Sequence, residues 1–136
     1  MIPFRVAFTP GIAIYDQVVY AAKKAIVAGQ LAPGAAFPSV RALSKELKIN
    51  PNTAHKVIAE LTSQGLLDVL PGIGTVISKQ ISSTVRQRKR LLGSDLERLV
   101  VEAKKFGLEL NDVISAVTEH WEALQDAELP KEVEHR

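Results

Sequence analysis

The hydrophobic positions between residues 14 and 65 repeat with helical spacing in three separate stretches. The first stretch covers residues 14–28 and ends at Gly29, a residue that readily takes the left-handed conformation found after helices. The second and third stretches cover residues 40–48 and 51–64. Only two or three residues separate these two, and such a short connection between short helices predicts a helix-turn-helix.

The second and third helices each begin beside a residue suited to capping. Ser39 precedes the second helix, and its hydroxyl can accept a hydrogen bond from a free amide of the first turn. Asn50 has the same place before the third helix. Pro51 follows in the first helical position, where its missing N–H costs nothing.

Two β-type runs, residues 66–70 and 75–78, flank the glycine-containing turn at residues 71–74, which predicts a hairpin. Residues 4–8 also alternate and stop at a turn signal, so they predict a short strand or an extended arm. The expected fold is therefore mainly α with a small β-hairpin. Three helices followed by a hairpin predict a winged helix-turn-helix domain over residues 1–80.

Residues 81–136 have a different pattern, which predicts two amphipathic helices joined by a tight turn. The apolar series are Leu92, Leu96, Leu99, Ala103 and Phe106, and then Leu110, Ile114, Val117, Trp121 and Leu124. We expect Asn111 to cap the second helix and residues 128–136 to be frayed. A helical hairpin has too little interior to bury both stripes, so we expect it to dimerise; the alternative is that it folds back onto the first domain.

Composition and charge narrow the functional classes. The chain has 136 residues, a net charge of +2 and no cysteine, which excludes thiolate metal sites, disulfide frameworks and thiol nucleophiles. Residues 1–80 carry 8 Lys and Arg against 4 Asp and Glu, whereas residues 81–136 carry 9 against 11. A polyanion is therefore expected on the first domain. With no long apolar run and no secretory signal at its start, the chain is expected to be cytoplasmic and free of membrane contact.

The third helix carries hydrogen-bonding and cationic residues away from its apolar stripe. These are Asn52, Thr53, His55 and Lys56. In a recognition helix such residues near the amino end reach base edges, and Arg41 in the preceding helix could pair with guanine or meet a phosphate. A small helix must also expose polar residues somewhere. A winged-helix protein interaction module is the alternative function, and it would favour an apolar surface here.

Residues 14–77 resemble the DNA-binding domain of the GntR family of bacterial transcription regulators. The resemblance lies in Ile14-Tyr15-Asp16-Gln17-Val18, Gly29 to Gly34, Pro38 to Ser44, Leu47 to Thr53, Leu61, Gly65-Leu66-Leu67 and Gly72 to Val76. The short two-helix C-terminal region and the extended start resemble the YtrA subgroup.

This resemblance implies a homodimer that binds a palindromic, double-stranded DNA operator, with the third helix in the major groove and the hairpin tip in the adjoining minor groove. The implied DNA-binding residues are Ser39, Arg41, Asn50, Asn52, Thr53, His55 and Gly72, and Lys56 joins them from its place on the helix. Many members have an arginine inside the recognition helix where this chain has His55 and Lys56, so base preference does not transfer. Repression is the expected effect, and no cofactor or dedicated small-molecule domain is expected.

Other motifs give no chemistry. Gly72-Ile73-Gly74 lacks the third glycine of a dinucleotide fingerprint, and the histidines lack metal-ligand spacing. No nucleophile and base are paired, so an enzyme is not expected. The basic residues Arg86, Arg88, Lys89 and Arg90 could contact phosphates, or could be the solvated start of a long helix.

Overall fold

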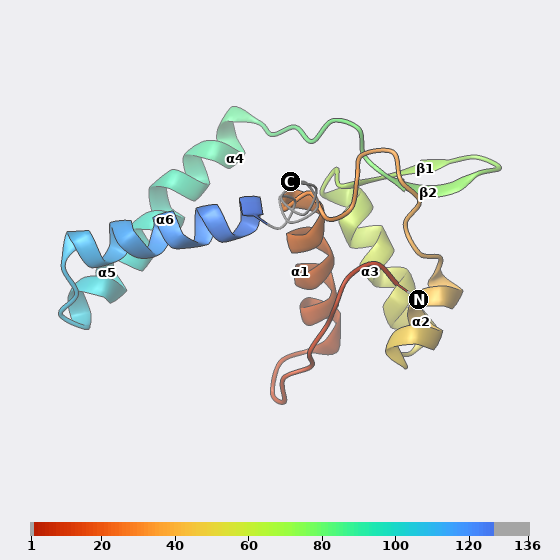
Figure 1. Ribbon diagram of the computed structural model, residues 1–136, viewed down its shortest axis with the longest axis horizontal. Coiled ribbons are helices and arrows are strands. Elements are labelled where there is room, and N and C mark those ends of the chain that lie inside the picture. The colour runs from red at the N-terminus through yellow and green to blue at the C-terminus, as the bar shows by residue number, and fades with distance from the viewer. Residues whose placement is uncertain (1, 127–136) are drawn as a thin grey trace, which may run out of the picture. The chain divides into compact units, whose positions relative to one another are not determined.

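A computed structural model describes residues 2–126 of the chain. The chain divides into two compact units, one formed by the residues up to Ile81 and the other by residues 82–124, and each is described by itself (Figure 1). The tail at residues 128–136, expected to be frayed, lies outside the described residues.

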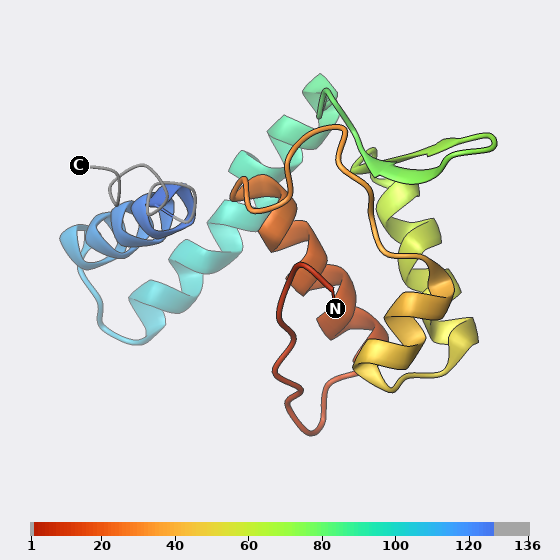
Figure 2. The same ribbon diagram turned by 45° about the vertical axis from the view of Figure 1, so that its right-hand side comes forward.

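The first unit contains the three predicted helices, α1 (Ile14–Val27), α2 (Val40–Leu47) and α3 (Pro51–Ser63). Helix α3 packs against both α1 and α2 (Figure 2). The side chains at the centre of this packing have no exposed surface: Val18, Ala22, Leu43, Ala54, Val57 and Leu61. Gly29 follows α1 with a φ of +84°, as the sequence predicts.

Both predicted helix caps are confirmed. The Ser39 hydroxyl accepts a hydrogen bond from the Ala42 amide at 3.1 Å, and the Asn50 carbonyl oxygen accepts one from the Asn52 amide at 2.7 Å. Helix α2 ends at Leu47, and Lys48 after it is the one described non-glycine residue with positive φ (56°). The turn from Lys48 to Asn50 therefore connects the two helices within three residues.

The predicted hairpin is confirmed as strands β1 (Leu67–Leu70) and β2 (Gly74–Ile77), paired antiparallel with Leu67 opposite Ile77. It projects from the three helices in both ribbon views (Figures 1 and 2). Residues 34–37 pair with the other edge of β2, an arrangement that the sequence did not indicate. The Phe37 amide donates to the Thr75 carbonyl and the Ile77 amide to the Ala35 carbonyl, each at 2.8 Å. The hairpin is thus fixed to the segment that leads into α2.

Residues 4–8 form an extended arm, and the alternative expectation of a strand is wrong because this segment pairs with no described strand. Phe4 is buried, and its ring stacks on Phe37 with 5.9 Å between centroids. The Gln17 side chain bonds the backbone of Thr9 through both its amide oxygen and its amide nitrogen, at 2.7 and 3.0 Å. Side-chain packing, not sheet pairing, therefore holds the arm.

The second unit is helical: α4 (Val85–Arg90), a π-helical turn η1 (Leu91–Asp95), α5 (Leu96–Lys105) and α6 (Leu110–Asp126). The first predicted helix therefore begins at Val85. Leu92, the first residue of its predicted apolar series, lies in the π-helical turn η1, so the series does not follow α-helical spacing throughout. The turn η1 and helix α5 follow α4 without a break.

The predicted cap at Asn111 is wrong, because α6 begins one residue earlier, at Leu110. The cap-like hydrogen bond is made by Asp112, whose carboxylate accepts from the Glu109 amide at 2.8 Å. Asp112 satisfies a free amide at the helix start and places a negative charge in the first turn, where the helix dipole favours it.

The second unit buries very little of its own apolar surface. Within residues 82–124, Ala103 is the one buried side chain. Trp121, Leu110, Phe106 and Leu92 are each 70% exposed or more. Among residues 2–126, no helix combines the length and the apolar character needed to cross a membrane.

We predict opposite effects of glycine at Lys45, inside α2, and at Lys48, the residue that follows this helix. Lys48→Gly should stabilise the first unit by about 0.5–1 kcal/mol, because glycine adopts the positive φ of this position without a Cβ penalty. Lys45→Gly, inside the helix, should destabilise the fold by about 1 kcal/mol. Urea unfolding of the full chain measures both, and a loss of stability in Lys48→Gly would contradict the assigned helix end.

Candidate nucleic-acid interface

Helix α3 separates a buried face from an exposed polar face. Ala54, Val57 and Leu61 are buried, which fixes how the helix is rotated about its axis. Asn52, His55 and Lys56 lie at helical spacing on the exposed side. The exposed side of the amino-terminal half therefore consists of side chains that can donate or accept hydrogen bonds.

Ser39 and Asn50 are capping residues that retain hydrogen-bonding capacity. The Ser39 oxygen accepts from the Ala42 amide, and its hydroxyl proton can still be donated. The Asn50 carbonyl oxygen accepts from the Asn52 amide, and the Asn50 side-chain NH₂ group carries two further donors. Both side chains are exposed, so their remaining donors face solvent.

Arg41 is exposed in the first turn of α2, two residues after the capping residue Ser39. The first turn of α2 also contains no acidic residue that would neutralise it. Amides in the first turn of a helix lack intrahelical acceptors and carry a partial positive charge. This end of α2 thus combines a guanidinium with backbone donors, a combination suited to an anion.

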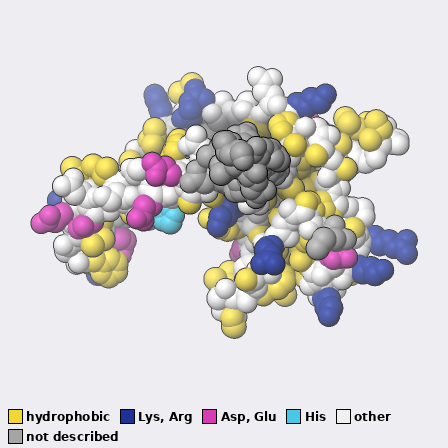
Figure 3. Space-filling model, viewed as in Figure 1, with side chains coloured by type: hydrophobic (Ala, Val, Ile, Leu, Met, Phe, Trp, Pro, Cys, Tyr) yellow, Lys and Arg dark blue, Asp and Glu magenta, His cyan; other side chains and the backbone are white. Residues whose placement is uncertain are grey.

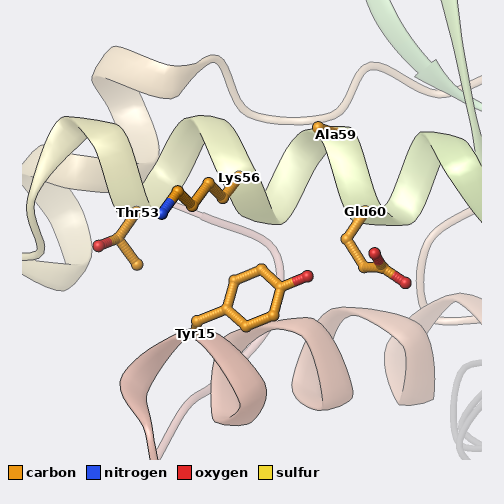
Figure 4. Close-up of a pocket in the computed structure, with 5 residues that line it drawn as sticks. All are labelled: Tyr15, Thr53, Lys56, Ala59 and Glu60. Atoms are coloured by element: carbon orange, nitrogen blue, oxygen red, sulfur yellow. The ribbon is translucent and has the colours of Figure 1, made fainter.

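A shallow hollow of about 500 Å³ lies between α1 and α3 (Figure 4). It is lined by Tyr15, Thr53, Lys56, Ala59 and Glu60. Thr53 is half-buried here, whereas the other predicted residues of α3 are exposed. The hollow brings the side chains of Thr53 and Lys56 next to Tyr15, a residue that the sequence reasoning did not select.

The Tyr15 hydroxyl keeps its proton at neutral pH. Partial removal from solvent, and then the charge of the neighbouring Glu60 carboxylate, raise the pKa of this hydroxyl above its usual value. A protonated phenol can donate a hydrogen bond. Its nearness to Thr53 depends on how α1 packs on α3, and no local sequence signal indicates that contact.

Glu60 places a negative charge at the other end of the same hollow. Thr53, Lys56 and Glu60 follow the spacing of one helical face, so this neighbourhood could have been inferred from the sequence. Because a carboxylate repels phosphate, the surface favourable to a polyanion lies toward the amino end of α3.

Gly72 lies at the tip of the hairpin. It has a φ of +77°, and Gly74 has a φ of +122°, so the turn uses backbone conformations that favour glycine. A Cβ added at Gly72 would meet no atom within 4 Å, so the position requires glycine for its conformation and not for lack of space. Ile73 between the two glycines is 76% exposed.

The structure thus brings the predicted residues of α2 and α3 to one helix-turn-helix, with Gly72 on the hairpin attached to it. Among the described residues, no group of three or more His, Asp or Glu side chains is placed to hold a metal ion. The space-filling view shows Lys and Arg side chains around the outer edge of the first unit (Figure 3).

Comparison with known proteins agrees with this arrangement. Residues 14–77 match the family described as bacterial regulatory proteins, gntR family. The HTH-type transcriptional repressor YtrA of Bacillus subtilis is 35% identical over 98 residues, which cover 71% of this chain and 75% of that protein.

Solved structures extend the similarity beyond the first unit. A transcriptional regulator from Oenococcus oeni is 30% identical with a TM-score of 0.60, over 85% of this chain and 96% of that one. A transcriptional antiterminator from Listeria monocytogenes gives a TM-score of 0.78 over 90% of this chain and 92% of that one, and at 23% identity it supports the fold alone. The predicted winged helix-turn-helix with C-terminal helices is confirmed. Given its matching helix-turn-helix and its 35% identity to YtrA over three quarters of that repressor, the chain belongs to the GntR family of bacterial regulatory proteins.

Proposed function

We propose that this DNA-binding transcription regulator is a repressor that binds a palindromic operator as a homodimer. The observation that carries the proposal is the polar, exposed amino-terminal half of α3, rigidly oriented by the buried residues on its other face. The printed name of its Bacillus subtilis relative, a transcriptional repressor, supports the direction of regulation. An operator on the bacterial chromosome places the protein in the cytoplasm.

In this proposal α3 enters the major groove. Asn52, His55 and Lys56 reach base edges or nearby phosphates, because they share the exposed side of the helix. Thr53, half-buried beside Tyr15, contacts the edge of the groove. His55 and Lys56 occur where many members have arginine, so the base preference of those members does not transfer to this chain.

The residues that flank α3 hold the duplex in position. Ser39 and Asn50 donate from their unused hydrogen-bonding groups to phosphates, and Arg41 pairs with guanine at the groove edge. The hairpin tip at Gly72 enters the adjoining minor groove, where the absence of a side chain lets the backbone come close. Phosphate contacts supply affinity, and base contacts supply specificity.

Dimerisation through residues 82–124 is proposed because their apolar side chains have no cover within the unit. The exposed large side chains include Leu92, Leu96, Leu99, Ile114, Val117 and Trp121. Exposed apolar side chains in this number favour a protein interface. A two-fold interface presents the same surface from both copies, and the two α3 helices then read two half-sites about one helical turn apart.

No dedicated effector domain is part of the proposal. The described helices of the second unit enclose almost no buried side chain of their own, whereas a ligand site needs a lined cavity.

Selection from a random duplex library tests the proposed function. The full-length protein should enrich one sequence family with two-fold symmetry, because two identical reading helices bind two half-sites. Sequencing of the bound duplexes measures this. Enrichment of an asymmetric sequence would contradict the dimeric mode, and no enrichment at all would contradict sequence-specific binding.

Arg41→Ala should weaken binding to the selected operator by about 1–3 kcal/mol, as expected for a bidentate pair with guanine. Binding to a random duplex should change much less. Fluorescence anisotropy with both duplexes measures the difference, and Lys24→Ala, an exposed cation in the last turn of α1, is the matched control. Equal losses on the two duplexes would assign Arg41 to a phosphate instead.

The double substitution Leu99→Glu and Trp121→Glu should convert the dimer to a monomer. Both side chains are exposed in the second unit, and two carboxylates per copy would be desolvated and would repel each other at a shared interface. Sedimentation at micromolar concentration measures the mass. Tyr20→Glu, at a 64% exposed position in α1, should leave the dimer intact, and a monomeric unmodified protein would contradict the proposal.

A further inference from the structure

A long stretch of the chain, from the hairpin into the second unit, is free of acidic residues. Residues 69–94 contain no Asp or Glu and carry five cations, four of them in α4: Arg86, Arg88, Lys89 and Arg90. We propose that α4 is a second DNA-binding element, which holds the phosphate backbone that flanks the operator half-site through Arg86, Lys89 and Arg90. This inference rests on the proposed function and adds a contact that reads no sequence.

Three of the four cations share one face of the helix. Arg86, Lys89 and Arg90 are related by steps of three and four residues, and all three are exposed. Arg88 points elsewhere: its guanidinium donates to the Ser83 hydroxyl at 2.8 Å and to the Ser83 carbonyl at 3.1 Å. The three remaining charges thus form a compact cationic face.

The start of α4 is fixed by a capping box. The Gln87 amide donates to the Thr84 hydroxyl at 3.0 Å, and the Thr84 amide donates to the Gln87 side chain at 2.8 Å. The Arg88 guanidinium also donates to Ser83, so the first turn of α4 is hydrogen-bonded to the residue that precedes its cap. A fixed helix start presents its cations in one direction and reduces the entropy lost on binding.

The cations do not serve the second unit itself. Within residues 2–126, no carboxylate forms an ion pair with Arg86, Lys89 or Arg90, whereas Arg98 lies 3.9 Å from Asp95. Arg86 also lies in the first turn of the helix, where the helix dipole favours negative charge. An external polyanion would give these three cations the partners that the described residues do not provide.

Chain length keeps α4 near the DNA that the hairpin contacts. Residues 78–84 connect Ile77, the last residue of β2, to Val85. Eight steps of extended chain reach at most about 29 Å, or roughly eight base pairs along a duplex. This upper bound allows α4 to lie beside phosphates that flank a half-site.

The test replaces the cationic face with neutral side chains of good helix propensity. The variant is the triple substitution Arg86→Gln, Lys89→Gln and Arg90→Gln. Its matched control, Arg98→Gln, Lys104→Gln and Lys105→Gln, removes the same charge from exposed positions of α5 in the same unit. Circular dichroism and sedimentation verify that both remain folded and in the same oligomeric state.

Anisotropy titrations over about 50–300 mM KCl use the operator selected by the unmodified protein and a random duplex of about 40 base pairs. Loss of three phosphate contacts should reduce the slope of log affinity against log salt by about 2.7 per subunit, since each contact contributes about 0.9. At about 0.1 M salt the affinity should fall by about 500-fold for each bound subunit, relative to the loss at 1 M salt, and on both duplexes, because phosphate contacts are independent of sequence. The control variant should keep the slope of the unmodified protein.

Two results would overturn the inference. The first is an equal slope for the two triple variants. The second combines unchanged DNA slopes with vesicle binding: the unmodified protein, but not the α4 variant, would bind vesicles containing about 30% anionic lipid. This second result would assign the cations to a membrane surface. The proposed function fails separately, if the unmodified protein shows no preference for any sequence. A reduced slope in the α4 variant, together with a preference for the operator that survives in it, supports both conclusions.

Discussion

The burial of Leu43, Val57 and Leu61 between the helices of the first unit is the constraint on which the interface depends. These side chains have no exposed surface, so α2 and α3 cannot rotate about their axes without opening a cavity in the core. This fixed orientation of α3 about its axis also makes Asn52, His55 and Lys56 face outward. Apolar packing on one side of α3 thereby sets the geometry of hydrogen bonding on the other.

The elements that local sequence rules govern were predictable. Ser39, Asn50 and Pro51 act within one helical turn of their own positions, so their residue types alone indicate where α2 and α3 begin. Asn111 shows the limit of this reasoning. Asp112, one position later, competes for the same helix start and satisfies the Glu109 amide, so that α6 begins earlier than the cap preference of asparagine suggests.

Features that depend on distant parts of the chain could not be predicted in this way. Residues 34–37 have no strand pattern, yet they pair with β2 because the fold brings them to its open edge. Tyr15 meets Thr53 and Lys56 only through the packing of α1 on α3. Residues 4–8 carry a strand pattern, but the stacking of Phe4 on Phe37 holds them as an arm. In each case tertiary contact overrides or adds to the local preference.

The π-helical turn η1 changes the direction in which the long helix of the second unit presents its side chains. One residue inserted into an α-helix rotates everything beyond it by roughly 100°. The cations of α4 lie before this turn, and the leucines of α5 lie after it. The cationic face before the turn and the apolar face after it therefore point in directions that are set separately. The length of the π-helical turn at Leu91–Asp95 determines the angle between these two faces.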